Sequence, residues 1–227
     1  MTAILSNLQA VHTAINQAAL KAQRGATQIS LLAVSKTVAA AVIREAYAQG
    51  QRAFGENFVQ EALDKMRDLH DLPLEWHFIG PIQSNKTRAI AENFSWVHSV
   101  DRLKIAQRLS EQRPIQLPPL NVCLQINISG EKSKGGVAVE EAESLAHAIA
   151  SLPHLKLRGL MAIPAPAKEL HEQRASFARM RELFLNLNRS GLTLDTLSMG
   201  MSHDLSAAIL EGATIVRVGT AIFGSRK

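Results

Sequence analysis

The chain has 227 residues, enough for one large domain or two small ones, and its 46% hydrophobic and 20% charged residues are typical of a soluble globular protein. A single cysteine, Cys123, excludes an intramolecular disulfide and fits a reducing compartment. No stretch approaches the roughly 20 apolar residues that span a bilayer, and the N-terminus lacks a signal-peptide pattern. We therefore expect a cytoplasmic protein that does not enter a membrane.

The net charge of +5 and the isoelectric point near 9.6 raise the question of nucleic acid. The basic residues are spread along the chain, and 4% aromatic residues provide little material for a base-stacking platform. We expect no nucleic-acid partner, because small anionic ligands suit the same charge better.

The predicted elements alternate along the chain. A first helix is expected up to about Arg24, because apolar residues recur at helical spacing from Ile4 to Ile15. Eight apolar runs typical of strands follow, namely ISLLAVS, RAFGE, EWHFIG, SWVHSV, NVCLQINI, LKLRGLMAI, LDTLSMG and TIVRVGT. Helical patterns lie between them, at 37–50, 57–70, 84–94, 101–112 (with an Asp start), 139–152, 168–191 and 202–212.

Strands that alternate with helices predict βαβ units and a parallel sheet. Eight units without a linker favour a closed α/β barrel, a (β/α)8 TIM-type fold, over an open doubly wound sheet. We expect a single domain over 1–227, in which the N-terminal helix at 1–24 packs on the barrel.

In such a barrel the active face lies at the carboxyl ends of the strands. Polar residues gather at these ends in the sequence, and the opposite ends carry no comparable set. The candidates are Lys36, Glu56, Asn57, Gly80, Pro81, Gln83, Ser84, Asn85, His98, Ser99, Asn127, Met161, residues 198–204, Arg217, Gly219 and Thr220.

The last two units suggest an anion site. GMS leads into HDLSAAILEG, so backbone N–H groups at a helix start and the Ser202 hydroxyl could bind a phosphate. In VGTAIFG, Gly219 would allow close backbone approach and Thr220 would offer a hydroxyl. The alternative is a purely structural role, in which these glycines only form turns and Ser202 only caps a helix.

Lys36 ends the first strand, and its amine could form a Schiff base with a phosphorylated aldehyde, or it could simply leave the strand for water. Arg217 comes from the last strand, which neighbours the first once a barrel closes. A nearby cation and burial would both lower the pKa of a lysine, as imine formation requires.

The segments LLAVSKT, FGENFVQEALDK, EWHFIGPIQSNK, INISGEKSKGG, RGLMAIPAP, LSMGMSHDL and VRVGTAIFG together closely resemble the pyridoxal phosphate homeostasis protein family. Members are single-domain barrels related to the N-terminal domain of alanine racemase. The resemblance implies that Lys36 binds pyridoxal 5'-phosphate (PLP), that the Ser202 and Gly219–Thr220 turns hold its phosphate, and that Arg217 faces the pyridine nitrogen. Asn57 would lie beside this cofactor, and no metal site is expected.

The choice between enzyme and carrier depends on a second base. The resemblance implies that barrel racemases with this cofactor use two bases, the cofactor-binding lysine and a tyrosine from an additional C-terminal domain. Here the only tyrosine is Tyr47, where packing is expected, and the chain ends at Lys227. A guanidinium at the pyridine nitrogen also favours a weak electron sink. His98 could substitute as a base, or it could be an ordinary polar residue of strand four.

We therefore expect a non-catalytic protein that carries PLP as a Schiff base and maintains PLP homeostasis, with apo PLP-dependent enzymes as recipients, as a monomer. The alternatives are a low-activity PLP-dependent amino-acid racemase and a lysine-dependent aldolase for a sugar phosphate. The GEKSKGG loop is expected to be solvated, or a basic flap in which Lys134 attracts phosphate. Cys123 is expected to be a small buried hydrophobe.

Overall fold

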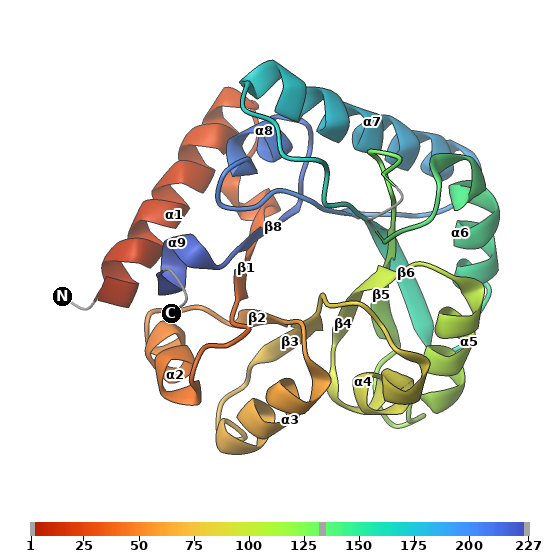
Figure 1. Ribbon diagram of the computed structural model, residues 1–227, viewed down its shortest axis with the longest axis horizontal. Helices are drawn as coiled ribbons and strands as arrows, with labels where there is room; N and C mark the ends of the chain where they lie inside the picture. Colours follow the sequence, from red (N-terminus) through yellow and green to blue (C-terminus); the bar gives the residue numbers. More distant parts are fainter. Residues whose placement is uncertain (1–2, 132–134, 225–227) are drawn as a thin grey trace.

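A computed structural model describes residues 3–131 and 135–224 of the chain. Eight parallel strands form a closed barrel in the order β1 to β8, as the alternation of elements predicts. The strands are β1 Ser30–Val34, β2 Ala53–Glu56, β3 Glu75–Phe78, β4 Trp96–Val100, β5 Leu120–Gln125, β6 Leu155–Met161, β7 Thr196–Ser198 and β8 Ile215–Val218. Figure 1 looks along the barrel, with the helices arranged around the strands.

Helices connect the strands on the outside of the barrel. They are α1 Ala3–Lys21, α2 Ala40–Ala48, α3 Val59–Asp68, α4 Thr87–Asn93, α5 Leu103–Gln112, α6 Ala142–Ala150, α7 Leu170–Arg189, α8 Leu205–Leu210 and α9 Thr220–Phe223. Short 3-10 turns are Ala26–Gln28, Ser84–Lys86 and Val139–Glu141. No helix among the described residues has both the length and the apolarity needed to span a membrane.

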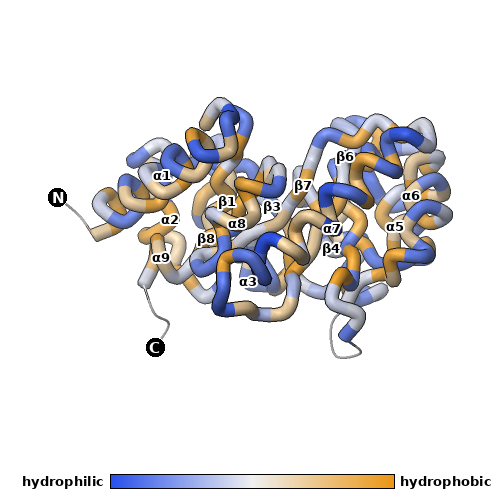
Figure 2. Tube along the Cα trace, turned by 90° about the horizontal axis from the view of Figure 1, so that it is seen from above, coloured by the Kyte–Doolittle hydropathy of each residue, from blue (hydrophilic) through white to orange (hydrophobic). Residues whose placement is uncertain are grey.

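The first helix packs on the barrel beside the end of the chain. One face of α1 is buried from Ile4 to Ala19, and it contacts α8 and α9 (Figure 1). The helix ends at Lys21, slightly before the expected Arg24. The tube in Figure 2 shows hydrophobic and hydrophilic residues alternating along the helices, as expected where one face of each helix meets the sheet.

Two apolar cores result from the alternation of side chains along each strand. The larger core lies between sheet and helices and includes Leu31 and Ala33 of β1. The residues in between point into the barrel, where a smaller core forms from Leu32, Trp96, Cys123, Met161 and Ile215. Strand β4 is buried over its whole length, as is typical of parallel strands covered on both faces.

The barrel closes through pairing of its first and last strands. Leu32 of β1 lies opposite Arg217 of β8, and Ala33 lies opposite Val218. Residues that are 185 positions apart in the sequence are therefore neighbours in the sheet. This pairing confirms the expected adjacency of the two strands that supply Lys36 and Arg217.

Some element boundaries differ from the sequence-based expectation. The helix expected from Ser202 begins only at Leu205, because residues 202–204 form a turn before it. Asp101 does not cap α5, whose N-cap is Arg102 without a side-chain hydrogen bond. His98 lies in the middle of β4, and the expected flap residue Lys134 lies outside the described residues.

Candidate functional site

The six residues expected at the site line a single pocket at the carboxyl ends of the strands. The pocket has a volume of about 200 Å³. Its lining residues are Val34, Lys36, Asn57, Ile79, Met161, Ile163, Met201, Ser202, His203, Arg217, Gly219 and Thr220. Apolar walls from several strands thus surround a small set of polar groups, which is the usual composition of a small-molecule site.

Arg217 lies at the buried end of this pocket. Its NH1 atom donates to the carbonyl oxygen and the hydroxyl of Ser198, at 2.6 and 2.8 Å, and NH2 donates to the Ala162 carbonyl at 2.9 Å. Burial lowers the pKa of Arg217 to about 10, which still leaves the guanidinium charged at neutral pH. Among the described residues these contacts use three of its five N–H donors, so two can meet a ligand.

Asn57 follows β2 and contributes an unsatisfied acceptor. Its Oδ1 atom is buried and has no hydrogen-bond partner within the described residues. Because a buried carbonyl without a partner costs free energy, such an atom indicates a ligand donor that completes it. A side chain at Gly80 would collide with the Asn57 carbonyl, whose distance from an added Cβ would be 2.1 Å, so glycine permits the close approach of the β2 and β3 ends.

Lys36 is partly buried in the pocket, and a group of charged residues holds the chain on both sides of it. We call Glu56, Glu61 and Lys65 the outer cluster, because they lie between β2 and α3, outside the barrel. Lys65 Nζ donates to the Ser35 carbonyl at 2.7 Å, to Glu56 at 2.8 Å and to Glu61 at 2.5 Å. Glu61 also accepts from the backbone N–H of Thr37 at 2.5 Å.

The outer cluster fixes a strained segment of backbone. Thr37 has a φ of 63°, a left-handed conformation that disfavours side chains with a branched Cβ. Glu56 is fully buried, accepts from the Ser35 hydroxyl at 2.6 Å, and has a pKa raised by burial despite its contact with Lys65. The segment 35–37 is thereby anchored, which aims Lys36 toward the pocket.

The turn at the expected anion site contains an additional carboxylate. Asp204 is the N-cap of α8 and accepts from the backbone N–H of Met201 at 2.6 Å. Ser202 lies in this turn and not at the helix start, whereas Gly219 and Thr220 form the N-cap and first residue of α9. Gly200 has a φ of 95°, and an added Cβ would come within 2.5 Å of Ala208, so the turn requires glycine.

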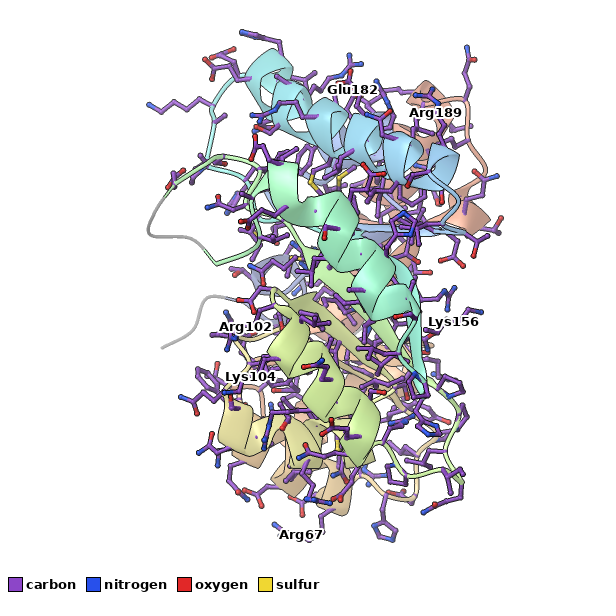
Figure 3. The ribbon with its side chains drawn as sticks, turned by 90° about the vertical axis from the view of Figure 1, so that its right-hand side faces the viewer. Arg67, Arg102, Lys104, Lys156, Glu182 and Arg189 are labelled. Carbon is purple, nitrogen blue, oxygen red and sulfur yellow. The ribbon has the colours of Figure 1, made fainter. Side chains whose placement is uncertain are left out.

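The opposite end of the barrel also carries a polar set, contrary to the sequence-based expectation. Arg158 pairs with Asp195 at 2.8 Å, donates to Asn121 at 2.9 Å and lies 4.7 Å from the ring centre of Trp96. Figure 3 shows the two ends, with Arg102 and Lys104 extending from one and Lys156 from the other. The groups around Arg158 bind each other, because strand starts from neighbouring units bring them together.

Three further expectations can be compared with the structure. Cys123 is buried and its pKa is raised to about 12 by burial, which confirms an inert small hydrophobe. Tyr47 does not line the pocket and stacks against Arg52, 3.9 Å from its ring centre, in agreement with packing. His98 is fully buried and also does not line the pocket. His203, from the predicted run 198–204, lines the pocket, whereas Ile79 and Ile163, which also line it, were not among the sequence candidates because apolar residues carry no such signal.

The fold and pocket define the class of protein. Residues 6–227 match the model of the family described as "Alanine racemase, N-terminal domain". The pyridoxal phosphate homeostasis protein of Pseudomonas aeruginosa is 65% identical over 100% of this chain and 97% of its own length, and that of Escherichia coli K12 is 54% identical over 100% and 98%.

A solved structure agrees with these relatives. PipY of Synechococcus elongatus PCC7942, with PLP bound, is 39% identical, has a TM-score of 0.84, and is matched over 97% of this chain and 100% of its own. The chain therefore belongs to the pyridoxal phosphate homeostasis protein family, as the motifs in its sequence indicate.

Proposed function

We propose that this protein binds PLP through a Schiff base on Lys36 and stores and delivers the cofactor without substantial catalysis of its own. The convergence of six residues on one pocket carries the proposal: Lys36, Asn57, Ser202, Arg217, Gly219 and Thr220. The names of the curated relatives and the PLP in PipY support the same ligand. We further propose apo PLP-dependent enzymes as recipients and a monomer in the cytosol as the working form.

The residues present fit PLP on three counts. The unsatisfied Asn57 Oδ1 offers an acceptor for a ligand hydroxyl, and the two remaining Arg217 donors suit an unprotonated ring nitrogen. Ser202, Gly219 and Thr220 line the same pocket and would hold the phosphate through hydroxyls and backbone N–H groups. PLP supplies an aldehyde, with which an unprotonated amine forms a C=N bond as water leaves.

Two lysines lie near the end of β1, and their surroundings distinguish them. Lys65 is buried and uses all three N–H donors on Ser35, Glu56 and Glu61, so its nitrogen cannot act as a nucleophile without breaking the outer cluster. Lys36 lines the pocket. Because hydrolysis reverses imine formation, the same amine can also release the aldehyde.

The charge on Arg217 supports a carrier over an enzyme. A ring nitrogen that faces a guanidinium stays unprotonated and withdraws electrons weakly, which slows chemistry at the α-carbon of an amino acid. The Ser198 and Ala162 contacts hold this guanidinium in place, and its pKa near 10 keeps it charged. At the ring nitrogen, Arg217 would thus take the place of the carboxylate that keeps the ring protonated in a strong electron sink.

Reduction and mass analysis test the role of Lys36. The protein is incubated with PLP, reduced with borohydride, and examined by intact mass and peptide mapping. We expect one adduct on the peptide that contains Lys36, its loss in Lys36→Ala, and its retention in the control Lys86→Ala, since Lys86 is exposed. A full adduct on Lys36→Ala would disprove the assignment.

The racemase alternative has one residue in its favour, because His203 lines the pocket and could serve as a second base. Protein loaded with PLP is incubated with single-enantiomer alanine and other amino acids, beside a His203→Ala variant. The carrier proposal expects no sustained change in enantiomeric composition with either protein. Multiple turnovers that disappear in His203→Ala would establish the enzyme instead.

A further inference from the structure

A row of polar side chains crosses the interior of the barrel from Arg217 to its opposite end. Ser198 Oγ lies 2.8 Å from Arg217 NH1 and 2.7 Å from His98 Nδ1. His98 Nε2 lies 2.9 Å from His77 Nδ1, and His77 Nε2 lies 3.2 Å from Glu75 Oε2. We call these five residues the interior chain. They cross an interior that apolar side chains dominate in barrels of this type.

The two histidines of the interior chain are isolated from water. Both are buried, and His77 stacks on Trp96 with an angle of 4° between the rings. Burial lowers the pKa of His77 and holds the pKa of His98 well below its usual value, with the charge of Arg217 also acting on His98. Each is therefore a neutral imidazole, which has one donor nitrogen and one acceptor nitrogen.

Arg217 and Glu75, at the two ends of the interior chain, determine which nitrogen of each histidine carries the proton. Arg217 can only donate, so Ser198 Oγ accepts from it and its own hydroxyl proton can go to His98 Nδ1. His98 then donates from Nε2 to His77 Nδ1. His77 carries its proton on Nε2, facing Glu75, whose pKa is lowered chiefly by this contact.

The opposite arrangement is unfavourable at the Glu75 end. It would leave the lone pair of His77 Nε2 facing the carboxylate at 3.2 Å. This contact is electrostatic, because Nε2 makes no aligned hydrogen bond with Glu75 within the described residues. Trp96 Nε1 donates to the other carboxylate oxygen at 3.1 Å and holds Glu75 in place. All contacts of the interior chain therefore have one direction.

Because all its hydrogen bonds run from Arg217 toward Glu75, the interior chain can orient Arg217 but cannot conduct protons into the pocket. A proton that moved along the histidines would have to stop at Ser198, because a guanidinium has no lone pair to receive it. Ser198 itself does not line the pocket. With NH1 fixed by Ser198 and NH2 by Ala162, only the directions of the remaining N–H groups are offered to a ligand.

We propose that Ser198, His98, His77 and Glu75 are positioning residues that orient Arg217 from inside the barrel, with both histidines held as neutral Nε2–H tautomers. The effect on PLP rests on the proposed function, whereas the tautomers do not. The role of Arg217 at the ring nitrogen is implied by the family; the interior chain explains how this particular sequence holds it there.

Nitrogen NMR of the protein without added PLP tests the direction of hydrogen-bond donation along the interior chain. Long-range ¹⁵N–¹H spectra of the full-length protein near neutral pH should show His77 and His98 as neutral Nε2–H tautomers. Assignment uses His77→Gln and His98→Asn, each of which removes one set of signals from the eight histidines. An imidazolium, or a Nδ1–H tautomer of His98, would overturn the proposal.

A matched pair of variants tests the effect on the pocket. In His98→Asn the amide oxygen can still accept from Ser198, whereas His98→Leu has no acceptor. We expect His98→Asn to bind PLP like the unmodified protein and His98→Leu to bind about tenfold more weakly, with a changed pH dependence of the absorption of bound PLP. Ser198→Ala should resemble His98→Leu, and it serves if the leucine variant does not fold.

The outcomes separate the two proposals. Equal affinity and equal spectra in Ser198→Ala and His98→Asn overturn the positioning role even if the tautomers are as expected. If the unmodified protein binds no PLP, the proposed function fails, and the NMR result still decides the direction of the interior chain.

Discussion

The interior chain and the outer cluster are two polar groups, buried except at Glu75 and in part at Glu61, that approach the same pocket by different physical means. The interior chain reaches Arg217 through neutral imidazoles and a hydroxyl, so it needs one hydrogen-bond direction and little charge. The outer cluster flanks Lys36 with a buried ammonium between two carboxylates. We therefore expect the interior chain to tolerate the loss of one hydrogen bond better than the outer cluster tolerates the loss of its central charge.

The largest expected effect is therefore in the outer cluster. Lys65→Met leaves the fully buried Glu56 without its cation, and breaking a buried ion pair in this way costs about 3–5 kcal/mol. Urea unfolding measures the loss. The double variant Lys65→Met with Glu56→Gln should recover part of it, because the fully buried position 56 then carries no charge. A loss below about 1 kcal/mol in the single variant would contradict the comparison.

Ser35→Ala removes one hydrogen bond to Glu56 and leaves the cation in place. We expect a loss of about 2 kcal/mol, since the 2.6 Å bond has a charged acceptor that is partly compensated by Lys65. Because Ser35 precedes Lys36, the variant should also slow formation of the borohydride-trapped adduct. Unchanged stability together with unchanged adduct formation would show that the outer cluster does not anchor this segment.

Acid should affect the two groups in opposite directions. Below about pH 6.5 a histidine binds a proton in the unfolded protein, whereas His77 and His98 stay neutral in the folded protein. As the pH falls, each of them therefore lowers the free energy of unfolding by up to about 1.4 kcal/mol per pH unit. Glu56 has a raised pKa, so the folded protein takes up its proton first and gains stability as pH falls.

Denaturant curves between about pH 7.5 and 4 separate these contributions, because the range includes the ordinary titration of both a histidine and a glutamate. Glu56→Gln removes the opposing gain, and its stability should fall more steeply with acid than that of the unmodified protein. His98→Asn removes one histidine, and its slope should be shallower. A parallel shift of all three curves would mean that neither group titrates differently in the folded protein.

The smallest effect is expected for an ion pair on the surface. Arg44 contacts Asp71 at 2.6 Å and lowers the pKa of its carboxyl to about 2, but both side chains are nearly half exposed. Water and salt screen such pairs, so Arg44→Ala should be indistinguishable from the unmodified protein in urea unfolding. A clear loss would show that charge pairing stabilises this protein irrespective of burial.

The barrel and the approximate place of the pocket could be predicted from the sequence because both follow from local patterns. Apolar runs and turns gave the strand order, and strand ends gave Lys36 and Arg217. His77 and His98 are 21 residues apart, and their contact depends on register between β3 and β4, which no local pattern contains. The same holds for Glu56, which points away from the pocket although it ends a strand.

The turn after β7 shows a different limit. The spacing SHDL suggested a helix cap at Ser202, but Asp204 supplies the N-cap position and binds the Met201 backbone instead. Serine and aspartate compete for such positions with similar free energies, so a sequence can place the turn without deciding which side chain completes it.

The closure between β1 and β8 has a consequence for any ligand of the pocket. Lys36 belongs to the beginning of the chain, whereas Gly219 and Thr220 belong to its last turn, and the seam between them is the one junction of the barrel that no connecting loop spans. A ligand that is bound to Lys36 and also contacts Gly219 and Thr220 links the two sides of this junction. We expect loss of such a ligand to weaken the pairing of β1 with β8, so hydrogen exchange along these two strands should be faster in the protein without PLP.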